Sequence, residues 1–279
     1  MNTLSTNDHR RDFAGMTYVY PVLSRRAGGV SVGINLNPNN ACNWHCVYCQ
    51  VPDLVRGTAP DIDLGLLERE LTAFLSALTP GDYLARHVPE GLRVIQDIAF
   101  SGNGEPTSAK GFDRIVERVA ACRDAAGLAT VPIRLITNGS LVGREEVRRG
   151  IARLAAAGGE VWFKVDAGRA EDIERINGVR IEPATVAHRL QTCAQLAPTW
   201  VQTCLFAWDG QAPTEEQIDA YLACLDAAGV DRLEGVLLYG VARESMQPEA
   251  PRVAALSADT LDACAARIRE SGLTVTVSP

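Results

Sequence analysis

Three cysteines lie within eight residues of the chain, at Cys42, Cys46 and Cys49. A structural zinc site uses four ligands, and disulfides use an even number of cysteines. His45 is the nearest further ligand, but it lies between two of the cysteines, and no second C-x2-C or H-x3-H pair follows. In a cubane [4Fe–4S] cluster, three thiolates leave one iron without a protein ligand. The spacing C-x3-C-x2-C therefore favours such a cluster with one position open to a cofactor or substrate.

Strand-like and helix-like segments alternate along the chain. Short β-branched and apolar runs predict strands at 30–36, 93–102, 131–139, 160–168, 199–208, 232–240 and 273–279. Apolar residues at helical spacing predict helices at 63–78, 111–127, 143–159, 183–196, 214–229 and 257–272. This order predicts an α/β fold with parallel strands, namely a partial (β/α)6 TIM-like barrel with a short C-terminal extension. We expect an N-terminal arm at 1–29, the barrel domain at 30–240, and a helix and strand packed on it at 241–279.

Polar residues follow three of the predicted strands, where the active sites of such folds lie. "FSGNGEPT" (100–107) ends the second strand, "LITNGS" (135–140) the third and "VWFKVDAG" (161–168) the fourth. Glycine permits close approach of the backbone to a ligand. Alternation along the fourth strand places Lys164 and Asp166 on one face, where they would pair over the pocket. On the fifth strand, Cys204 is a candidate hydrogen donor to a radical, with a buried structural thiol as the alternative.

These motifs together resemble the radical S-adenosylmethionine (radical SAM) superfamily. The resemblance implies that Cys42, Cys46 and Cys49 bind a [4Fe–4S] cluster, whose fourth iron is chelated by S-adenosylmethionine. One electron then cleaves this cofactor to a 5′-deoxyadenosyl radical, which abstracts hydrogen from a substrate. We expect flavodoxin or ferredoxin to supply the electron.

The resemblance also assigns cofactor contacts. Tyr48 is expected to pack near the adenine, and Glu105 to receive the cofactor's ammonium group. The other expected cofactor-binding residues are Gly102, Asn103, Gly104, Pro106, Thr137, Asn138, Ser140, Lys164 and Asp166. We expect Lys164, Asp166 and Cys204 to be the candidate catalytic residues.

Within the superfamily, "CNWHCVYCQ", "FSGNGEPT", "ITNGS" and "KVDAG...INGV" look most like the bacterial branch similar to wyosine synthases. The chain has no cysteine before Cys42, so it lacks the upstream ligands of the second cluster of the tRNA-modifying wyosine enzymes. We expect a radical SAM enzyme acting on a small molecule or a nucleobase. The alternatives are an activase that installs a glycyl radical on a partner protein, a tRNA-modifying wyosine synthase-like enzyme, and a non-catalytic metal-binding module.

Composition limits the partners. The formal net charge is −7, which disfavours a large nucleic-acid interface. No run of 18 apolar residues is present, and the polar start carries no secretory pattern. We therefore expect a cytoplasmic protein with no membrane partner.

Overall fold

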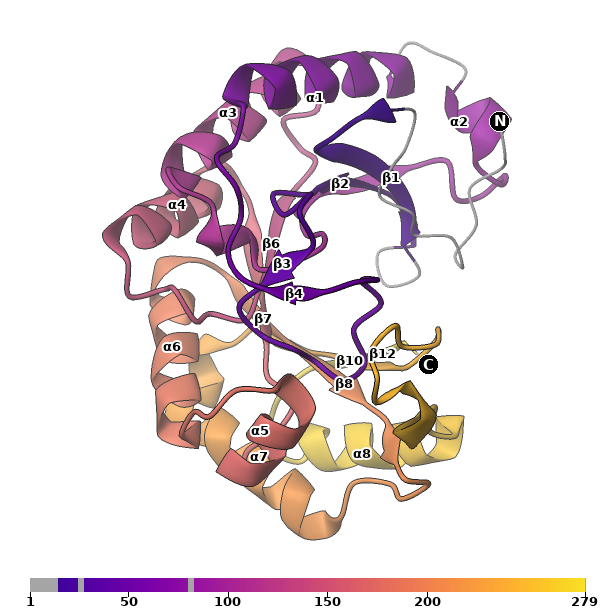
Figure 1. Ribbon diagram of the computed structural model, residues 1–279, viewed down its shortest axis with the longest axis vertical. Helices are drawn as coiled ribbons and strands as arrows, with labels where there is room; N and C mark the ends of the chain where they lie inside the picture. Colours follow the sequence, from indigo (N-terminus) through magenta and orange to yellow (C-terminus); the bar gives the residue numbers. More distant parts are fainter. Residues whose placement is uncertain (1–14, 25–27, 80–82, 279) are drawn as a thin grey trace.

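The computed structural model describes residues 15–24, 28–79 and 83–278. Its centre is an eight-stranded sheet in the order β1-β2-β5-β6-β7-β8-β10-β12. Seven of these strands are parallel: β2 (Gly29–Ile34), β5 (Ile95–Phe100), β6 (Ile133–Thr137), β7 (Glu160–Lys164), β8 (Thr199–Leu205), β10 (Gly235–Gly240) and β12 (Val275–Ser278). The sheet curls into part of a barrel, so the predicted fold class is confirmed (Figure 1).

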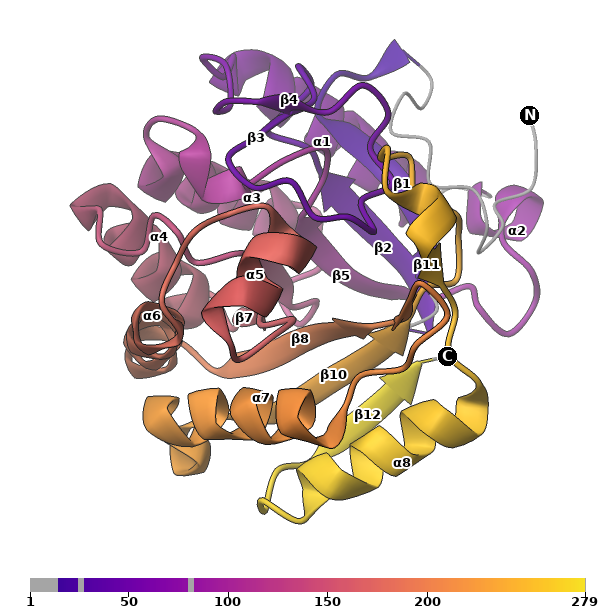
Figure 2. The same ribbon diagram turned by 60° about the horizontal axis from the view of Figure 1, so that its bottom comes forward.

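The eighth strand, β1 (Val19–Ser24), pairs antiparallel with β2 at the edge of the sheet. Part of the expected N-terminal arm is thus a buried strand, whereas residues 1–14 lie outside the described residues. At the other edge β12 pairs with β10, so the C-terminal strand extends the same sheet (Figure 2).

Helices cover the outer face of the sheet: α1 (Leu64–Leu78), α3 (Phe112–Ala125), α4 (Glu145–Ala156), α6 (Pro183–Leu196), α7 (Glu215–Ala228) and α8 (Ala258–Arg269). On α1 the apolar face buries Leu67, Leu71 and Phe74, as the spacing predicted. Thr214 and Gln217 form a capping box at the start of α7, whose helix the sequence predicted.

Short elements occupy the connections: α2 (Tyr83–His87), α5 (Ala170–Asn177), β3 (Ala41–Cys42), β4 (Val55–Arg56), β9 (Ala207–Trp208), β11 (Val253–Ala254) and the 3-10 turns η2 (Pro106–Ser108), η3 (Val230–Arg232) and η4 (Ala250–Arg252). Sequence periodicity did not predict α5. No helix in the described part of the chain has the length and apolar character needed to cross a membrane.

The two faces of the sheet differ in chemistry. Outward residues such as Ile98, Leu135 and Phe163 join the main hydrophobic core beneath the helices. Inward residues such as Asp97 and Lys164 line a cavity instead. Alternation along each strand thus separates the stabilising core from the polar interior.

Candidate functional site

A cavity of about 250 Å³, here called the central cavity, lies between the inner face of the sheet and residues 35–54, here called the cysteine loop. Ten of the predicted site residues line it: Cys42, Cys46, Tyr48, Cys49, Gly102, Asn103, Gly104, Glu105, Asn138 and Lys164. Five do not: Pro106, Thr137, Ser140, Asp166 and Cys204. Motifs more than 100 residues apart therefore meet in one place.

The three loop cysteines are half-buried thiols on the wall of this cavity. Burial raises the pKa of Cys42 to about 11 and that of Cys46 to about 12. Among the described residues, no three His, Cys, Asp or Glu side chains converge on a single metal-ion position. A cubane cluster does not need its ligands to converge on one metal ion, because each cysteine binds a different iron. Each thiol loses its proton when it binds iron. The three-thiol set thus fits that cluster.

Asn43 fixes the cysteine loop to the end of β6. Its Nδ2 donates to Ser140 Oγ at 2.6 Å, and its Oδ1 accepts from Asn138 Nδ2 at 2.9 Å. Asn138 Oδ1 in turn accepts from the backbone N–H of Ser140 at 3.0 Å. Asn138 and Ser140, which were predicted as cofactor contacts, therefore hold the loop that carries the cysteines.

Gly102 and Gly104 let the segment after β5 lie against the start of the same loop. A Cβ atom at Gly102 would be 2.4 Å from Asn35 Oδ1, and one at Gly104 would be 2.1 Å from the Ala41 carbonyl oxygen. The Asn103 backbone N–H donates to Asn35 Oδ1 at 3.1 Å. The close packing of this segment against the cysteine loop therefore already requires glycine at both positions. A contact between these glycines and a cofactor stays a prediction.

Glu105 joins the ends of β5 and β6. Its buried carboxylate accepts from Thr137 Oγ1 at 2.6 Å, from the Asn138 N–H at 2.8 Å, and from the N–H and hydroxyl of Thr107. Burial raises the pKa of Glu105, although these hydrogen bonds act in the opposite direction. Pro106 begins η2 directly after it. The carboxylate thus orders the strand ends, and its contact with the cofactor's ammonium stays a prediction.

Tyr48 connects the cysteine loop to the end of β7. Lys164 Nζ donates to Tyr48 Oη at 2.6 Å, and the Tyr48 hydroxyl donates to Asp166 Oδ2. Burial lowers the pKa of Lys164, but its acidic neighbours, Tyr239 and Asp166 foremost, outweigh burial and raise it well above its ordinary value. The predicted Lys–Asp pair is therefore bridged by the phenol.

Lys164 and Asp166 both contact the Tyr48 hydroxyl, and the intervening Val165 joins Phe163 in the main core, so the predicted alternation continues to Asp166. Lys164 lines the central cavity, whereas Asp166 does not. Asp166 accepts from the Cys204 N–H at 3.0 Å and from Asn177 Nδ2 at 2.8 Å. The Cys204 thiol is buried beside Phe206 and Tyr48.

Helix α5 holds the middle of the cysteine loop. The His45 and Val47 N–H groups donate to the carbonyl oxygens of Asn177 and Ile176, both at 2.9 Å. Asn177 Nδ2 also lies 3.4 Å from Cys46 Sγ, and a hydrogen bond to a ligand sulfur tunes an iron–sulfur cluster. Sequence reasoning missed Asn177 as a site residue, although "INGV" contains it.

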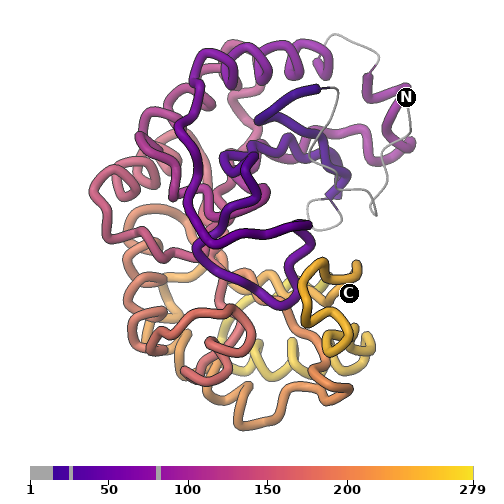
Figure 3. The backbone as a smooth tube through the Cα atoms, viewed as in Figure 1, coloured from indigo at the N-terminus to yellow at the C-terminus, as the bar shows by residue number. Residues whose placement is uncertain are grey.

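Residues 245–247 hold the end of the loop, and Figure 3 shows this C-terminal segment beside it. Ser245 Oγ donates to the Val47 carbonyl oxygen at 2.7 Å, and Gln247 Nε2 donates to that of Val51 at 2.8 Å. The Met246 N–H donates to the Cys49 carbonyl oxygen at 2.9 Å. No sequence signal distinguished these anchors, because only the fold brings them to the loop.

The wall of the central cavity on β2 and β5 is polar but internally paired. Asp97 accepts hydrogen bonds from Ser31 and Arg134, and Arg134 Nε also contacts Glu160 Oε1 at 2.6 Å. The Arg134 guanidinium stacks 4.7 Å from the centre of the Trp162 ring. These contacts balance the buried charges of this wall.

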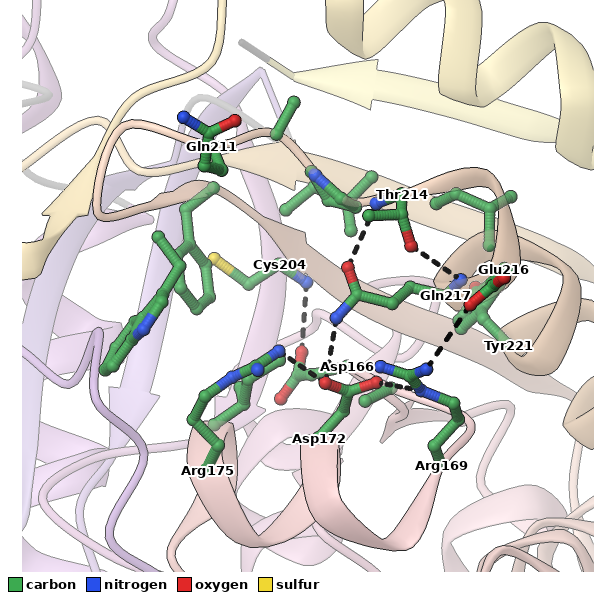
Figure 4. A pocket seen from close by; sticks show the side chains of 18 of the residues that line it. Asp166, Arg169, Asp172, Arg175, Cys204, Gln211, Thr214, Glu216, Gln217 and Tyr221 are labelled. Atoms are coloured by element: carbon green, nitrogen blue, oxygen red, sulfur yellow. Dashed lines mark hydrogen bonds and ion pairs between the residues drawn. The ribbon is translucent and has the colours of Figure 1, made fainter.

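A second cavity of about 400 Å³, here called the side cavity, lies between α5 and the segment that leads into α7 (Figure 4). Asp172 is at its centre, where it binds Arg169 Nε at 2.6 Å, Gln217 Nε2 at 2.8 Å, and Arg175. Burial acts to raise the pKa of Asp172, but these hydrogen bonds and the two guanidinium groups outweigh it and lower the pKa. Asp166 and Cys204 line this cavity.

The family comparison agrees with this geometry. A model of the radical SAM superfamily matches residues 36–222, which include the three cysteines and the ends of β5 to β8. The chain therefore belongs to the radical SAM superfamily, whose cofactors are a [4Fe–4S] cluster and S-adenosylmethionine.

The chain also resembles individual proteins, each at 34% sequence identity or less. The chain is 30% identical over 131 residues to the GTPase Obg of Brachyspira hyodysenteriae, covering 46% of this chain and 16% of that protein. It is 34% identical over 151 residues to the UPF0026 protein MJ1312 of Methanocaldococcus jannaschii, covering 52% and 39%. It thus spans less than half the length of either. A radical SAM methyltransferase from Sphaerobacter thermophilus shares the fold, with a TM-score of 0.62, 14% identity, and coverage of 93% of this chain and 68% of that one.

Proposed function

We propose that the protein is a radical SAM enzyme that acts on a small molecule bound in the central cavity. The observation that supports this most is that all three cysteines, the segments after β5 and β6, and Lys164 at the end of β7 line that one cavity. When bound, the cluster and S-adenosylmethionine supply reductive cleavage of the cofactor and abstraction of hydrogen from a substrate.

The chain's own residues would hold and shield this chemistry. Cys42, Cys46 and Cys49 would hold the cluster, and the Gly102–Pro106 segment with Asn138 would bind the cofactor's amino-acid group. Trp44 and Tyr48 are buried on the cavity wall, where they limit the access of water. Because the three cysteines are only half-buried, an electron from flavodoxin or ferredoxin would reach the cluster at this side of the protein.

The test is anaerobic reconstitution with iron and sulfide, followed by dithionite and S-adenosylmethionine. The wild type should release 5′-deoxyadenosine, and Cys46→Ala should lose both cluster and product. Cys264→Ala, on α8 outside the cavity, should retain both. A wild type that binds about four irons and equal sulfide, as a cubane cluster requires, yet never cleaves the cofactor would contradict the proposal.

The finer assignments remain predictions: the branch similar to wyosine synthases, action on a nucleobase or tRNA, and activation of a glycyl-radical partner. Incubation of the active enzyme with bulk tRNA, followed by nucleoside analysis, would test the tRNA branch. The glycyl-radical activity would appear as a protein radical signal on a co-purified partner.

A further inference from the structure

The side chain of Asn177, at the end of α5, lies between a carboxylate and a cysteine of the cysteine loop. It is 1% exposed, and its Nδ2 is 2.8 Å from Asp166 Oδ2 and 3.4 Å from Cys46 Sγ. The nitrogen of a side-chain amide carries two donor hydrogens, whereas its oxygen only accepts. Asn177 therefore has one hydrogen for the carboxylate and a second one for the sulfur.

Asp166 determines which way this amide faces. In the reversed orientation Asn177 Oδ1 would lie against Asp166 Oδ2, and two acceptors at that distance repel each other. Asp166 is itself held in place by the Tyr48 hydroxyl and by the Cys204 N–H at 3.0 Å (Figure 4). This set of hydrogen bonds keeps one N–H of Asn177 directed at Cys46.

The backbone of α5 fixes the same contact from both sides of the cysteine. The Asn177 carbonyl oxygen accepts from the His45 N–H at 2.9 Å, just before Cys46. The Ile176 carbonyl oxygen accepts from the Val47 N–H at 2.9 Å, just after it. Main-chain hydrogen bonds therefore set the position of the Cys46 sulfur relative to α5, and the Asn177 amide adds a donor at that sulfur.

A donor at a ligand sulfur acts on the redox balance of an iron–sulfur cluster. The reduced cluster carries one more electron than the oxidised one, so a hydrogen bond to its sulfur ligand stabilises the reduced state more and raises the reduction potential. A hydrogen bond to a charged group contributes about a tenfold change in an equilibrium. For a one-electron couple, a tenfold change corresponds to about 59 mV.

We propose that Asn177 is a positioning residue that acts through Cys46, and that its hydrogen bond raises the reduction potential of the cluster. This inference rests on the proposed function, because it concerns the same cluster. The effect would make it easier for flavodoxin or ferredoxin to deliver the single electron that the proposed reaction needs.

Potentiometric titration of the reconstituted enzyme, with electron paramagnetic resonance of the reduced cluster as the signal, tests the inference. Asn177→Leu keeps the branched shape but has no donor, and it should lower the midpoint potential by about 59 mV, a tenfold change. Asn177→Thr is the second variant in case the first does not fold. Its hydroxyl has one donor hydrogen, which the charged carboxylate of Asp166 takes, so the potential should fall here too.

Ser245→Ala is the matched control. It removes hydrogen bonds to the carbonyl oxygens of Val47 and Cys49 and one from the Gln247 N–H, but none to a cysteine sulfur. It should speed loss of iron–sulfur absorbance in the presence of a chelator and leave the midpoint potential unchanged.

An unchanged midpoint potential in both Asn177 variants at full iron and sulfide content would overturn the inference. An equal shift in Ser245→Ala would assign the effect to a looser loop, and loss of the cluster from both Asn177 variants would assign Asn177 to holding it; either result would also overturn the inference. Release of 5′-deoxyadenosine is measured on the same preparations. Cofactor cleavage by the wild type without the shift removes the inference alone, whereas the shift without cleavage removes the proposed function alone.

Discussion

A glutamine in the central cavity and a glutamine in the side cavity differ in their hydrogen bonding. In the side cavity, Asp172 is surrounded by Arg169, Arg175 and Gln217, and Gln217 also accepts from the Thr214 N–H. In the central cavity, Gln202 Nε2 has no partner in the described chain. Satisfied polar groups stabilise a fold, whereas a buried donor without a partner in the chain needs an acceptor from outside it, either a ligand or an ordered water. Size does not reveal this difference, because the side cavity is the larger one.

The largest effect on stability is expected in the side cavity. Asp172→Asn should lower the free energy of unfolding by about 2–3 kcal/mol, because it removes the buried charge shared by two guanidinium groups. The value is below that of a fully buried pair, since Arg169 and Arg175 are 33% and 38% exposed. Urea denaturation measures it. A change below about 0.5 kcal/mol, which is typical of a surface substitution, would remove the contrast between the cavities.

Low pH should reduce the destabilisation caused by Asp172→Asn. The folded-state pKa of Asp172 is lowered, so its contribution is complete above the unfolded-state pKa of about 3.9 and is lost as pH falls through the folded value. The difference in unfolding free energy between the wild type and Asp172→Asn should therefore shrink from pH 7 to pH 3. A difference that stays constant over this range would show that the negative charge of Asp172 does not contribute to the free energy of unfolding.

The cysteine loop should show an intermediate effect. Asn43→Ala removes two hydrogen bonds to the end of β6 and should cost about 1–2 kcal/mol. It should also speed loss of iron–sulfur absorbance in the presence of a chelator, because the loop is held less firmly. Asn39→Ala is the matched control; it removes an exposed contact with Thr58 and a 3.3 Å hydrogen bond from the Ala41 N–H, but no bond to β6. Equal rates of cluster loss in the two variants would argue against an anchoring role for Asn43.

The smallest effect compares two glutamines. Gln202→Leu should leave the free energy of unfolding unchanged or raise it by up to about 1 kcal/mol, because it removes an unpartnered buried amide. Gln217→Leu should lower it by about 1 kcal/mol, because that side chain binds both Asp172 and the start of α7. Thermal unfolding of both variants measures the difference. A Gln202→Leu protein less stable than Gln217→Leu would show that Gln202 makes a stabilising contact within the folded chain.

The sequence predicted the parts of the fold that depend on local pattern. The spacing of Leu67, Leu71 and Phe74 predicted a helix. The position of the motifs at the ends of predicted parallel strands correctly indicated that they line one cavity. Strand β1 was missed because its place at the sheet edge depends on pairing with β2, and α5 because it spans only eight residues, half of them charged.

The candidate site was predicted by residue type more than by contact. Alternation correctly placed Lys164 and Asp166 on the face opposite Val165, although only Lys164 lines the central cavity. The anchors Asn177 and Gln247 are brought to the cysteine loop only by long-range packing. A local pattern carries no information about partners more than 100 residues away.

The anchors of the cysteine loop also set an order of events during synthesis. Ser245 bonds to the Val47 carbonyl oxygen across 198 positions of sequence, and the Gln247 contact with Val51 spans 196. A chain made from its N-terminus exposes the three cysteines long before these last contacts form. The native loop is therefore completed only after residues 245–247 have been made, and the iron–sulfur cluster would enter a late folding product rather than a short nascent chain.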